Sequence, residues 1–416
     1  MECVILLIRL LAGGLGCLAA LWGGYYLVVG LMSWRCPVDC GAHPSKTRFA
    51  VLIAARNEEM VIGPLIQSLV AQNYPRELYH IWVIPNNCTD DTAGEARRWG
   101  AHVLNCTIPV KNKGEVLRFA YGVLAHKGYD AFCVFDADNL VHPDFLQEMN
   151  NAYLCGARAA QGYRDSKNPY DTVTSGCCSI YYWMMDRFHN GGHAALGLPA
   201  MINGTGFMIA TSALEEMGGW STRTISEDLE LSALCTMAGI RVWWVPKART
   251  FDEQPLSFAQ SVRQRRRWSS GTLQVGERFL PRVWAEGTRQ PSMPLADLGM
   301  TLLIPAYQLA MLASAGAEAV NAFMREDTIA AALACSAVAL AMDLLMTVLG
   351  SVLAAGLVIS VEGKWDRRLI KALLLYWVFL LSWLPITVSS FWKKTTVWEE
   401  IRHTRRIAPE GLLSGK

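Results

Sequence analysis

The chain has 416 residues, a formal net charge of only +2 and 52% hydrophobic residues. So small a net charge gives no indication of a nucleic-acid partner. The length allows one sizeable domain and more besides, and the hydrophobic content indicates that part of the remainder lies in a membrane.

Residues 10–33 contain no charged side chain and are flanked by Arg9 and Arg35. A helix over this stretch is long enough to cross a bilayer. The stretch is too long for the apolar part of a signal peptide, and no clear cleavage site of small residues closes it. We therefore predict a retained membrane anchor within residues 1–40.

The block 41–295 is polar and mixed in sequence, and its size suits one α/β domain. Apolar runs at 49–54, 81–84 and 132–135 predict buried strands, and a short strand is expected at 102–104. Helices are predicted over 61–70 and from Lys113 onward. This alternation predicts half of a doubly wound sheet, which can bind a nucleotide although the G-x-G-x-x-G fingerprint is absent.

The strand at 132–135 runs directly into Asp136 and Asp138. Ligands bind beyond the carboxyl ends of strands in open α/β sheets, and carboxylate oxygens suit Mg²⁺ or Mn²⁺ held between protein and phosphates. Paired Asp residues also cap helices, so the pair alone is weak evidence. Lys113 suits a phosphate at a helix N-terminus, although a solvated lysine is the more common reading of one such residue.

The second half of the block is less regular. We predict a polar loop over 161–168, a long helix over about 171–189, and a strand that begins near Gly204 and Gly206. Ser226 is expected to cap a helix whose first turn holds Glu227 and Asp228, an arrangement that more often serves capping than catalysis.

A helix near the end of the block carries Gln264, Arg267 and Trp268. Gln264 and Arg267 share one face, so a fixed cation and an amide are presented together beside a flat indole. Guanidinium groups hold pyrophosphate oxygens, and an indole can stack on a sugar ring. For the neighbouring Arg263, Arg265 and Arg266 we expect that at least one contacts anionic lipid head groups.

The twelve cysteines are scattered, which favours free thiols in a reducing compartment over a disulfide scaffold. Cys36, Cys40 and His43 form a short group with the residue types of a zinc site, but no fourth ligand is evident.

Three further membrane segments are predicted within 296–416, at 298–317, 328–361 and 372–392. Pro305 offers a break in the first of them. Asp343, in the second, either lines a polar path or marks a loop between two short helices.

An odd number of spans after a cytosolic domain would place the basic tail outside the cell, against the preference of Lys393, Arg402 and Arg405 for the inside. The span count therefore contains a conflict. The tail itself, with Trp398, Ile401 and His403, is expected to form an amphipathic helix at the membrane surface.

Taken in order, these motifs resemble the membrane-integrated inverting glycosyltransferases of family 2, the group that includes cellulose, chitin and hyaluronan synthases, and within it a bacterial subgroup. The resemblance covers about 49–271. It rests on the turns near Glu58 and Asn86, the D-x-D at 136–138, the acidic pair at 227–228 and the Q-x-x-R-W at 264–268.

The resemblance implies an A-type glycosyltransferase fold, a Rossmann-like mixed sheet with N- and C-terminal transmembrane helices, and a UDP-sugar donor with Mg²⁺ or Mn²⁺. It implies that Asp138, helped by Asp136, holds the metal and that Asp228, beside Glu227, is the base that activates the acceptor. The residues implied around the nucleotide are Ala55, Arg56, Glu58, Asn86, Lys113 and Asp136. Those implied around the acceptor and diphosphate are Gly204, Thr205, Gly206, Gln264, Arg267 and Trp268.

The chain departs from the family's pattern at two positions. Asn86 stands where an Asp is usual, which makes selectivity for uracil less certain, and Ser226 replaces a Thr before the acidic pair.

The Q-x-x-R-W motif favours a processive enzyme that extends a β-linked polysaccharide. Transfer of one sugar to a lipid is the alternative, because four membrane segments make a narrow channel unless copies of the chain or an export partner associate. A non-catalytic nucleotide sensor is disfavoured because Asp138, Asp228 and Arg267 are all present. The expected location is the bacterial plasma membrane, with the catalytic domain in the cytoplasm.

Overall fold

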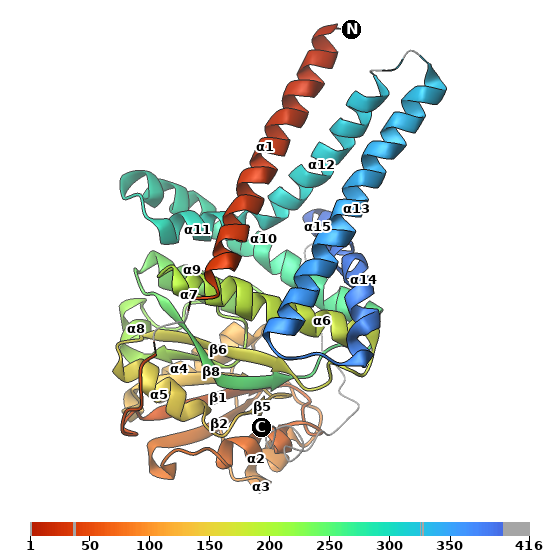
Figure 1. Ribbon diagram of the computed structural model, residues 1–416. Coiled ribbons are helices and arrows are strands. Elements are labelled where there is room, and N and C mark those ends of the chain that lie inside the picture. Colours follow the sequence, from red (N-terminus) through yellow and green to blue (C-terminus); the bar gives the residue numbers. More distant parts are fainter. Residues whose placement is uncertain (1, 36–38, 325, 327, 394–416) are drawn as a thin grey trace.

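The computed structural model describes residues 2–35, 39–324, 326 and 328–393. An α/β domain carries three long helices that rise together from one side of it (Figure 1): α1 (Glu2–Met32), α12 (Ile304–Phe323) and α13 (Ile329–Val361). α1 precedes the α/β domain in the chain, and α12 and α13 follow it.

A single eight-stranded mixed sheet forms the domain, in the order β3-β2-β1-β4-β7-β6-β8-β5. β1, β2, β3 and β4 are parallel, whereas β7 is antiparallel to both β4 and β6. All residues of β1 are buried, as its unbroken apolar sequence predicts for a strand covered on both faces. The strands are β1 (Phe49–Ala55), β2 (Tyr79–Pro85), β3 (His102–Val103), β4 (Ala131–Asp136), β5 (Leu140–Val141), β6 (Ala159–Ser166), β7 (Phe207–Ala210) and β8 (Val242–Asp252).

Helices cover both faces of the sheet. α2 (Ile62–Val70) and α5 (Phe145–Leu154) pack on one face. The other face is covered by α4 (Lys113–Leu124) and α6 (Val173–Met184), and also by the lower turns of α13 and by α14 (Ile370–Leu381), since Val358 and Tyr376 belong to the same buried cluster as Phe132. The core of the domain therefore continues into the lower turns of α13 and into α14. The remaining helices are α3 (Thr92–Arg98), α7 (Gly191–Ala195), α8 (Thr211–Glu216), α9 (Glu227–Met237), α10 (Phe258–Arg289), α11 (Met293–Leu302) and α15 (Trp383–Trp392).

The prediction of a polar loop at 161–168 is wrong, because most of this stretch is strand β6. β6 pairs with β7 on one side and with β8, an 11-residue strand that we did not predict, on the other. Most of its polar side chains are buried, and the Gln161 amide donates to the carbonyls of Gly162 and Thr205 at 3.0 Å, whereas Ser166 Oγ has no hydrogen-bond partner among the described residues. Polar composition therefore concealed a central strand.

The chain after α13 is tied to this strand. Lys364 Nζ donates to Asp165 Oδ2 at 2.6 Å, and the Tyr163 hydroxyl donates to Glu362 Oε2 at 2.8 Å. Two residues of β6 thus hold the segment that follows α13, and Arg164 lies between them in the strand.

The long helix predicted at 171–189 begins after Thr172, whose hydroxyl caps α6. It ends in a π-helical turn, η3 (Met185–Asn190), that leads into α7. Single π turns inside helices often accompany functional sites.

Three helical segments are long and apolar enough to span a membrane, Ala12–Met32, Ile329–Val361 and Arg367–Trp392, and a bent pair passes the same criterion jointly. The predicted segment at 298–317 is this pair: α11 and α12 meet at 61° beside Pro305. The predicted segment at 328–361 is the continuous helix α13, which excludes a loop at Asp343.

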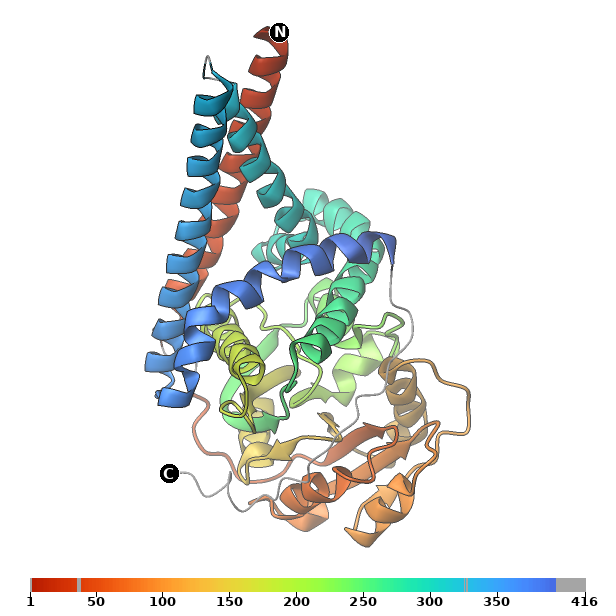
Figure 2. The same cartoon turned by 90° about the vertical axis from the view of Figure 1, so that its right-hand side faces the viewer.

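The last predicted segment, 372–392, is broken at Ser382 into α14 and α15. Figure 2 shows this pair running across the feet of α12 and α13 instead of rising beside them. The pair packs against α6, α10 and α13.

The ten cysteines whose state is described are free thiols, as predicted. Cys40 and His43 lie beside Cys155, whose Sγ is 3.5 Å from His43 Nε2. Within the described part of the chain no group of three or more His, Cys, Asp or Glu is placed to hold a metal ion, and Cys36 lies outside the described residues. The predicted tail helix with Trp398, Ile401 and His403 lies outside them as well.

Candidate active site

The predicted site residues come from the carboxyl ends of β1, β2 and β4, from the first turns of α4 and α9, from the loop before β7 and from α10. Lys113 stands at their centre. Its ammonium contacts Asp136 Oδ1 at 2.5 Å, the carbonyl of Gly204 at 2.6 Å and Glu227 Oε1 at 3.6 Å. Asn112 caps α4 by accepting from the Glu115 N–H, which fixes the turn that delivers Lys113.

The Lys113 and Glu227 side chains are largely shielded from solvent, whereas the Asp136 carboxylate is partly exposed. Burial opposes the charged form of Asp136, but Lys113 and Arg164 outweigh it and hold the pKa of Asp136 below its usual range. Burial also opposes the charge on Lys113, yet Asp136 and Glu227 keep the pKa of Lys113 above its ordinary value. Lys113 is thus a fixed cation between the D-x-D and the acidic pair.

Glu227 and Asp228 begin α9. Ser226 precedes them as predicted, although its side chain makes no capping hydrogen bond. Burial raises the pKa of Glu227 to about 7 and raises the pKa of Asp228 above its ordinary value. Asp228 Oδ2 lies 3.2 Å from the position that a Cβ on Gly204 would occupy, so a side chain at 204 would crowd the carboxylate. A carboxyl with a raised pKa suits a general base.

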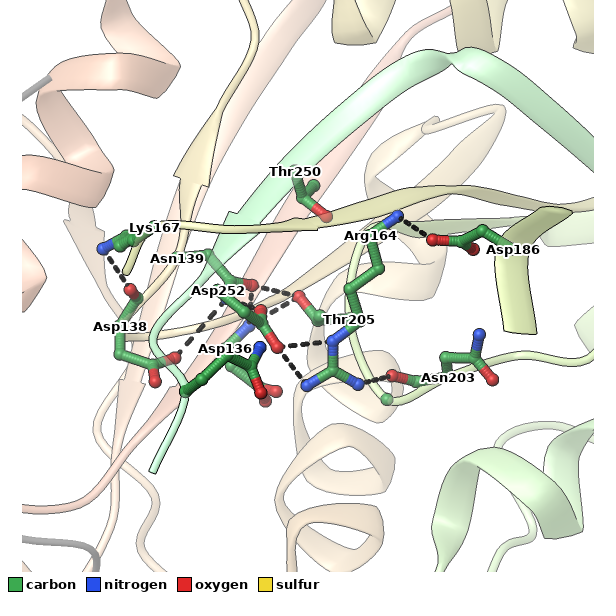
Figure 3. A network of polar contacts seen from close by, with 12 residues as sticks. Asp136, Asp138, Asn139, Arg164, Lys167, Asp186, Asn203, Thr205, Thr250 and Asp252 are labelled. Carbon is green, nitrogen blue, oxygen red and sulfur yellow. Dashed lines mark hydrogen bonds and ion pairs between the residues drawn. The ribbon is translucent and has the colours of Figure 1, made fainter. Parts of the chain in front are cut away.

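A hydrogen-bond network behind the D-x-D fixes its turn (Figure 3). The Asp136 N–H donates to Thr205 Oγ1 at 3.1 Å and to Asn139 Oδ1 at 3.2 Å, and the Thr205 hydroxyl donates in turn to Asn139 Oδ1. The Asn139 amide donates to Asp252 Oδ1 at 2.5 Å. Thr205, implied as an acceptor residue, therefore faces the D-x-D turn.

The backbone of Gly206 lies close to Thr250 of β8. Its φ is +62°, a left-handed conformation, and a Cβ there would lie 2.8 Å from Thr250 Cγ2. Glycine at this position lets the 203–206 loop lie directly against β8.

Arg164 is a site residue that the sequence did not single out. Its guanidinium pairs with Asp252 and donates to the Asn203 carbonyl at 2.6 Å (Figure 3). It also lies 4.2 Å above the ring of Tyr182. Burial raises the pKa of Asp252 to about 6, against the opposing pull of Arg164. Arg164 and Lys113 thus hold two successive carbonyls, of Asn203 and Gly204. Arg164 could not be recognised as a site residue from the sequence because it lies in the stretch that was interpreted as a loop.

The residues implied around the nucleotide are neighbours. Arg56 donates to Asn86 Oδ1 through Nε at 3.1 Å and Nη2 at 2.9 Å, and Asn86 Nδ2 donates to the Ala55 carbonyl at 2.9 Å. The Glu58 N–H donates to Thr92 Oγ1 at 2.9 Å. Asn57 and Asn87, one on each turn, have positive φ values of 57° and 50°. Two non-glycine residues in the left-handed region on adjacent turns are a strain often found at functional sites.

Asp138 follows Asp136 at the same strand end. Lys167 donates to its carbonyl, which leaves the carboxylate directed away from that contact (Figure 3). One or two carboxylates and the substrate's phosphates commonly suffice for Mg²⁺ or Mn²⁺. The donor set at 136–138 fits such an ion, although the described residues contain no cluster of three acidic or His/Cys ligands.

Gln264, Arg267 and Trp268 lie on α10 as predicted, but not all face the same space. Trp268 packs against Tyr181, at 6.2 Å between ring centroids, and against Trp383, at 6.1 Å, and these two rings also contact each other at 5.9 Å. The charge of Arg267 favours the ionised forms of Asp136 and Asp228, although burial still holds the pKa of Asp228 above its ordinary value. Gln264 Oε1 is buried without a hydrogen-bond partner among the described residues.

The three neighbouring arginines differ in their exposure to solvent. Arg263 and Arg266 are exposed, whereas Arg265 is fully buried, so the lipid-contact prediction does not apply to it. Arg265 donates to the Phe379 carbonyl at 3.0 Å and to Ser382 Oγ at 2.7 Å, and its guanidinium lies 4.2 Å above the Phe379 ring. It holds the break between α14 and α15 against α10.

A cavity of about 640 Å³ opens beside Asp228. Arg164, Tyr182, Asn203 and Trp268 are among its other lining residues. Its other walls come from α1, α12, α13, α14 and α15, and are largely apolar. Representative residues of these walls are Leu27, Pro305, Ala354, Leu357, Leu380 and Trp383.

A protein-family model described as "Glycosyltransferase like family 2" matches residues 45–271, more than half of the chain. Among curated proteins, the chain is 29% identical over 243 residues to a probable glycosyltransferase, YdaM, of Bacillus subtilis, covering 56% of this chain and 57% of that one. It is 26% identical over 233 residues to a beta-monoglucosyldiacylglycerol synthase of Synechocystis, covering 54% and 47%. The chain thus spans about half the length of these relatives.

Among solved structures, the mannosyltransferase PcManGT of Pyrobaculum calidifontis, determined with GDP-Man and Mn²⁺, aligns with a TM-score of 0.62 at 18% identity. The alignment covers 93% of this chain and 100% of that one. This likeness confirms the predicted A-type fold, including the helices at the two ends.

Proposed function

Because the chain belongs to glycosyltransferase family 2, we propose that it transfers a hexose from a UDP-sugar to a hydroxyl group of a membrane lipid, with inversion at the anomeric carbon. The observation that carries the proposal is the cavity that joins Asp228 to the apolar faces of α1, α12, α13 and α14. A base placed at the end of an apolar cavity among membrane helices suits an acceptor whose hydroxyl is polar and whose remainder is hydrocarbon.

The reaction needs a base on one side of the sugar and a stabilised leaving group on the other. Asp228 removes the proton of the acceptor hydroxyl, and the raised pKa brings it nearer to the working pH. Lys113 and Arg267 place positive charge beside the D-x-D, where the diphosphate leaves. A divalent ion bound at Asp138 and Asp136 would neutralise further charge on the departing nucleotide.

The nucleotide itself is the less constrained part of the proposal. Asn86 Oδ1 already accepts two hydrogen bonds from Arg56, so it is less available to a uracil N–H than the Asp that is usual there. We take UDP-sugars as the first donors to test and GDP-mannose as the competitor, since the structural neighbour PcManGT was determined with GDP-Man.

A processive polysaccharide synthase is the second candidate. The observation in its favour is the aromatic stack of Tyr181, Trp268 and Trp383 at the cavity, because flat rings can hold sugars. The apolar walls beyond the stack favour a lipid instead, since a sugar polymer would leave its hydroxyl groups unpaired there.

The membrane arrangement of the proposal differs from our span count. If α1, α12 and α13 cross the bilayer and the α14–α15 pair lies at its surface, then Lys393 falls on the same side as the catalytic domain. A cytoplasmic domain in the plasma membrane of a bacterium then satisfies the positive-inside preference, and the conflict over the tail disappears.

The test uses the full chain in lipid nanodiscs with radiolabelled UDP-glucose, UDP-N-acetylglucosamine or GDP-mannose, and with Mg²⁺ or Mn²⁺. Label should run with lipid and be absent with Asp228→Asn. Ala354→Trp should lower lipid labelling at least about tenfold by narrowing the cavity, with UDP binding unchanged. Leu353→Trp is the matched control, because Leu353 is the adjacent residue on α13 and is 71% exposed.

High-mass, glycosidase-sensitive product would establish the polymerase instead. Equal lipid labelling by Ala354→Trp and Leu353→Trp would exclude the cavity as the acceptor site. Absence of Asp228-dependent turnover with every sugar nucleotide would overturn the enzyme assignment as a whole.

A further inference from the structure

α13 carries a carboxylate that the proposed reaction does not use. Asp343 lies in the interior of this continuous helix, and its side chain is exposed. Within the described part of the chain its carboxylate has no ion pair or hydrogen bond. Apart from the helix's own backbone hydrogen bonds, the polar contact of this residue is at its backbone carbonyl, which accepts from Thr347 Oγ1 at 2.9 Å. An isolated carboxylate among apolar residues calls for an explanation.

The length of α13 places Asp343 inside the hydrocarbon. Along the helix axis it lies about 21 Å from Ile329 and about 27 Å from Val361. Both distances are shorter than the ~30 Å thickness of the hydrocarbon core. Wherever along its length the helix crosses the core, Asp343 is therefore within it.

The surface around Asp343 is open. α12 packs on α13 near their connecting turn, where Ser336 donates to the Ala319 carbonyl, and the two helices diverge toward the domain (Figure 2). Asp343 shares its face of α13 with Met346, which is 64% exposed, and with Gly350, where an added Cβ would meet nothing within 4 Å. Small residues beside a polar one allow a second helix to approach closely in a membrane.

We propose that this face of α13, centred on Asp343, is the docking surface for a membrane helix of another protein that carries a Lys or Arg at the same depth. Charge complementarity selects this occupant, because a cation removes the isolated charge from the hydrocarbon. A second copy of this chain is a poorer match, since packing the same faces together would oppose two carboxylates. The inference goes beyond the transferase reaction and does not depend on it.

The probe is a synthetic transmembrane peptide of Leu and Ala with one central Lys, compared with the same peptide lacking Lys. Association with the full-length protein is measured by energy transfer in phosphatidylcholine vesicles. The Lys peptide should bind about tenfold more tightly than the Leu/Ala peptide. Asp343→Leu should remove the difference, and Asp343→Asn should keep a part of it through its amide.

A matched pair of variants distinguishes docking from long-range attraction. Gly350→Leu fills the open face about two helical turns from Asp343. It should weaken binding of the Lys peptide severalfold although the carboxylate is intact. Leu345→Phe, on another side of α13, should not. Transferase turnover of Asp343→Leu should equal that of the unmodified chain, which separates this inference from the proposed function.

Equal binding of the two peptides would overturn the proposal. Self-association of the chain that is abolished by Asp343→Leu would overturn it in favour of a second copy, and indifference to Gly350→Leu would show that no helix seats on this face.

Discussion

Lys113 Nζ and Asp136 Oδ1 lie 2.5 Å apart, and this contact joins the first turn of α4 to the end of β4. Lys113 has a buried side chain, and its other partners are the Gly204 carbonyl and Glu227. One ammonium group therefore touches the D-x-D, the loop beside the cavity and the acidic pair.

Lys113→Met should abolish most activity, by at least about a hundredfold, because Asp136 and Glu227 would face each other without a cation. Turnover and UDP binding by calorimetry measure the effect. Lys113→Arg should retain part of the activity, because it keeps the positive charge. Lys111→Met is the control, since Lys111 is exposed two residues earlier. Full UDP affinity and turnover in Lys113→Met would contradict a role at the diphosphate.

The acidic pair predicts opposite pH dependences of activity and stability. Asp228 must be ionised to act as a base, so the rate should rise as pH increases through the range in which the pair titrates. The raised pKa of Glu227 favours its protonated form in the folded state. This preference contributes to the free energy of unfolding in full below pH 4.5, the ordinary pKa of a glutamate. The contribution, up to about 3 kcal/mol, is lost as the pH rises from there through about 7.

Chemical denaturation across this pH range measures the loss. Glu227→Gln should flatten the stability profile, because the amide does not titrate. A free energy of unfolding that rises across the same range in the unmodified chain would show that Glu227 is not held in its neutral form.

Asp252→Asn should lower the free energy of unfolding by about 3 kcal/mol, because it leaves the buried Arg164 without its carboxylate. The double variant Arg164→Met with Asp252→Leu should recover much of this stability, since it removes both charges. It should not recover activity, because the Asn203 carbonyl would still lack its donor. Denaturation and turnover of the three proteins, measured side by side, test this; recovered activity in the double variant would reduce Arg164 to a structural role.

Arg265→Met should destabilise the chain by about 3 kcal/mol and raise the KM for the acceptor, since Arg265 holds α14 and α15 and, through Trp383, the stack on Trp268. Arg266→Met should change stability by less than about 0.5 kcal/mol, because Arg266 is exposed. Thermal unfolding and acceptor titrations compare the two. Similar effects of both substitutions would show that Arg265 does not hold α14 and α15 in place.

The sequence was sufficient for the parts of the fold with unbroken apolar runs. Strands β1 and β4 could be predicted because a strand that is covered on both faces is apolar along its buried length. Asp136 marks the point where the burial of β4 ends. The motifs of the donor side followed, since each lies immediately after such a strand or at a helix start.

The acceptor side was less accessible to sequence reasoning. β6 contains Gln161, Arg164 and Asp165, whose polarity conceals a strand that is buried by pairing with partners far along the chain. Arg164 was missed for that reason. The direction of the α14–α15 pair was equally hidden, because hydropathy reports that a helix is apolar and not whether its apolar side meets lipid or the domain.

If α13 crosses a bilayer, as proposed, the two contacts that tie its end to β6 connect that bilayer mechanically to the α/β domain. Lys364 holds Asp165, and Glu362 holds Tyr163, on either side of Arg164. A thinner or thicker bilayer changes the tilt of a helix as long as α13. That change would be delivered to the strand that carries Arg164, so the enzyme's rate should vary with the acyl-chain length of the lipids around it.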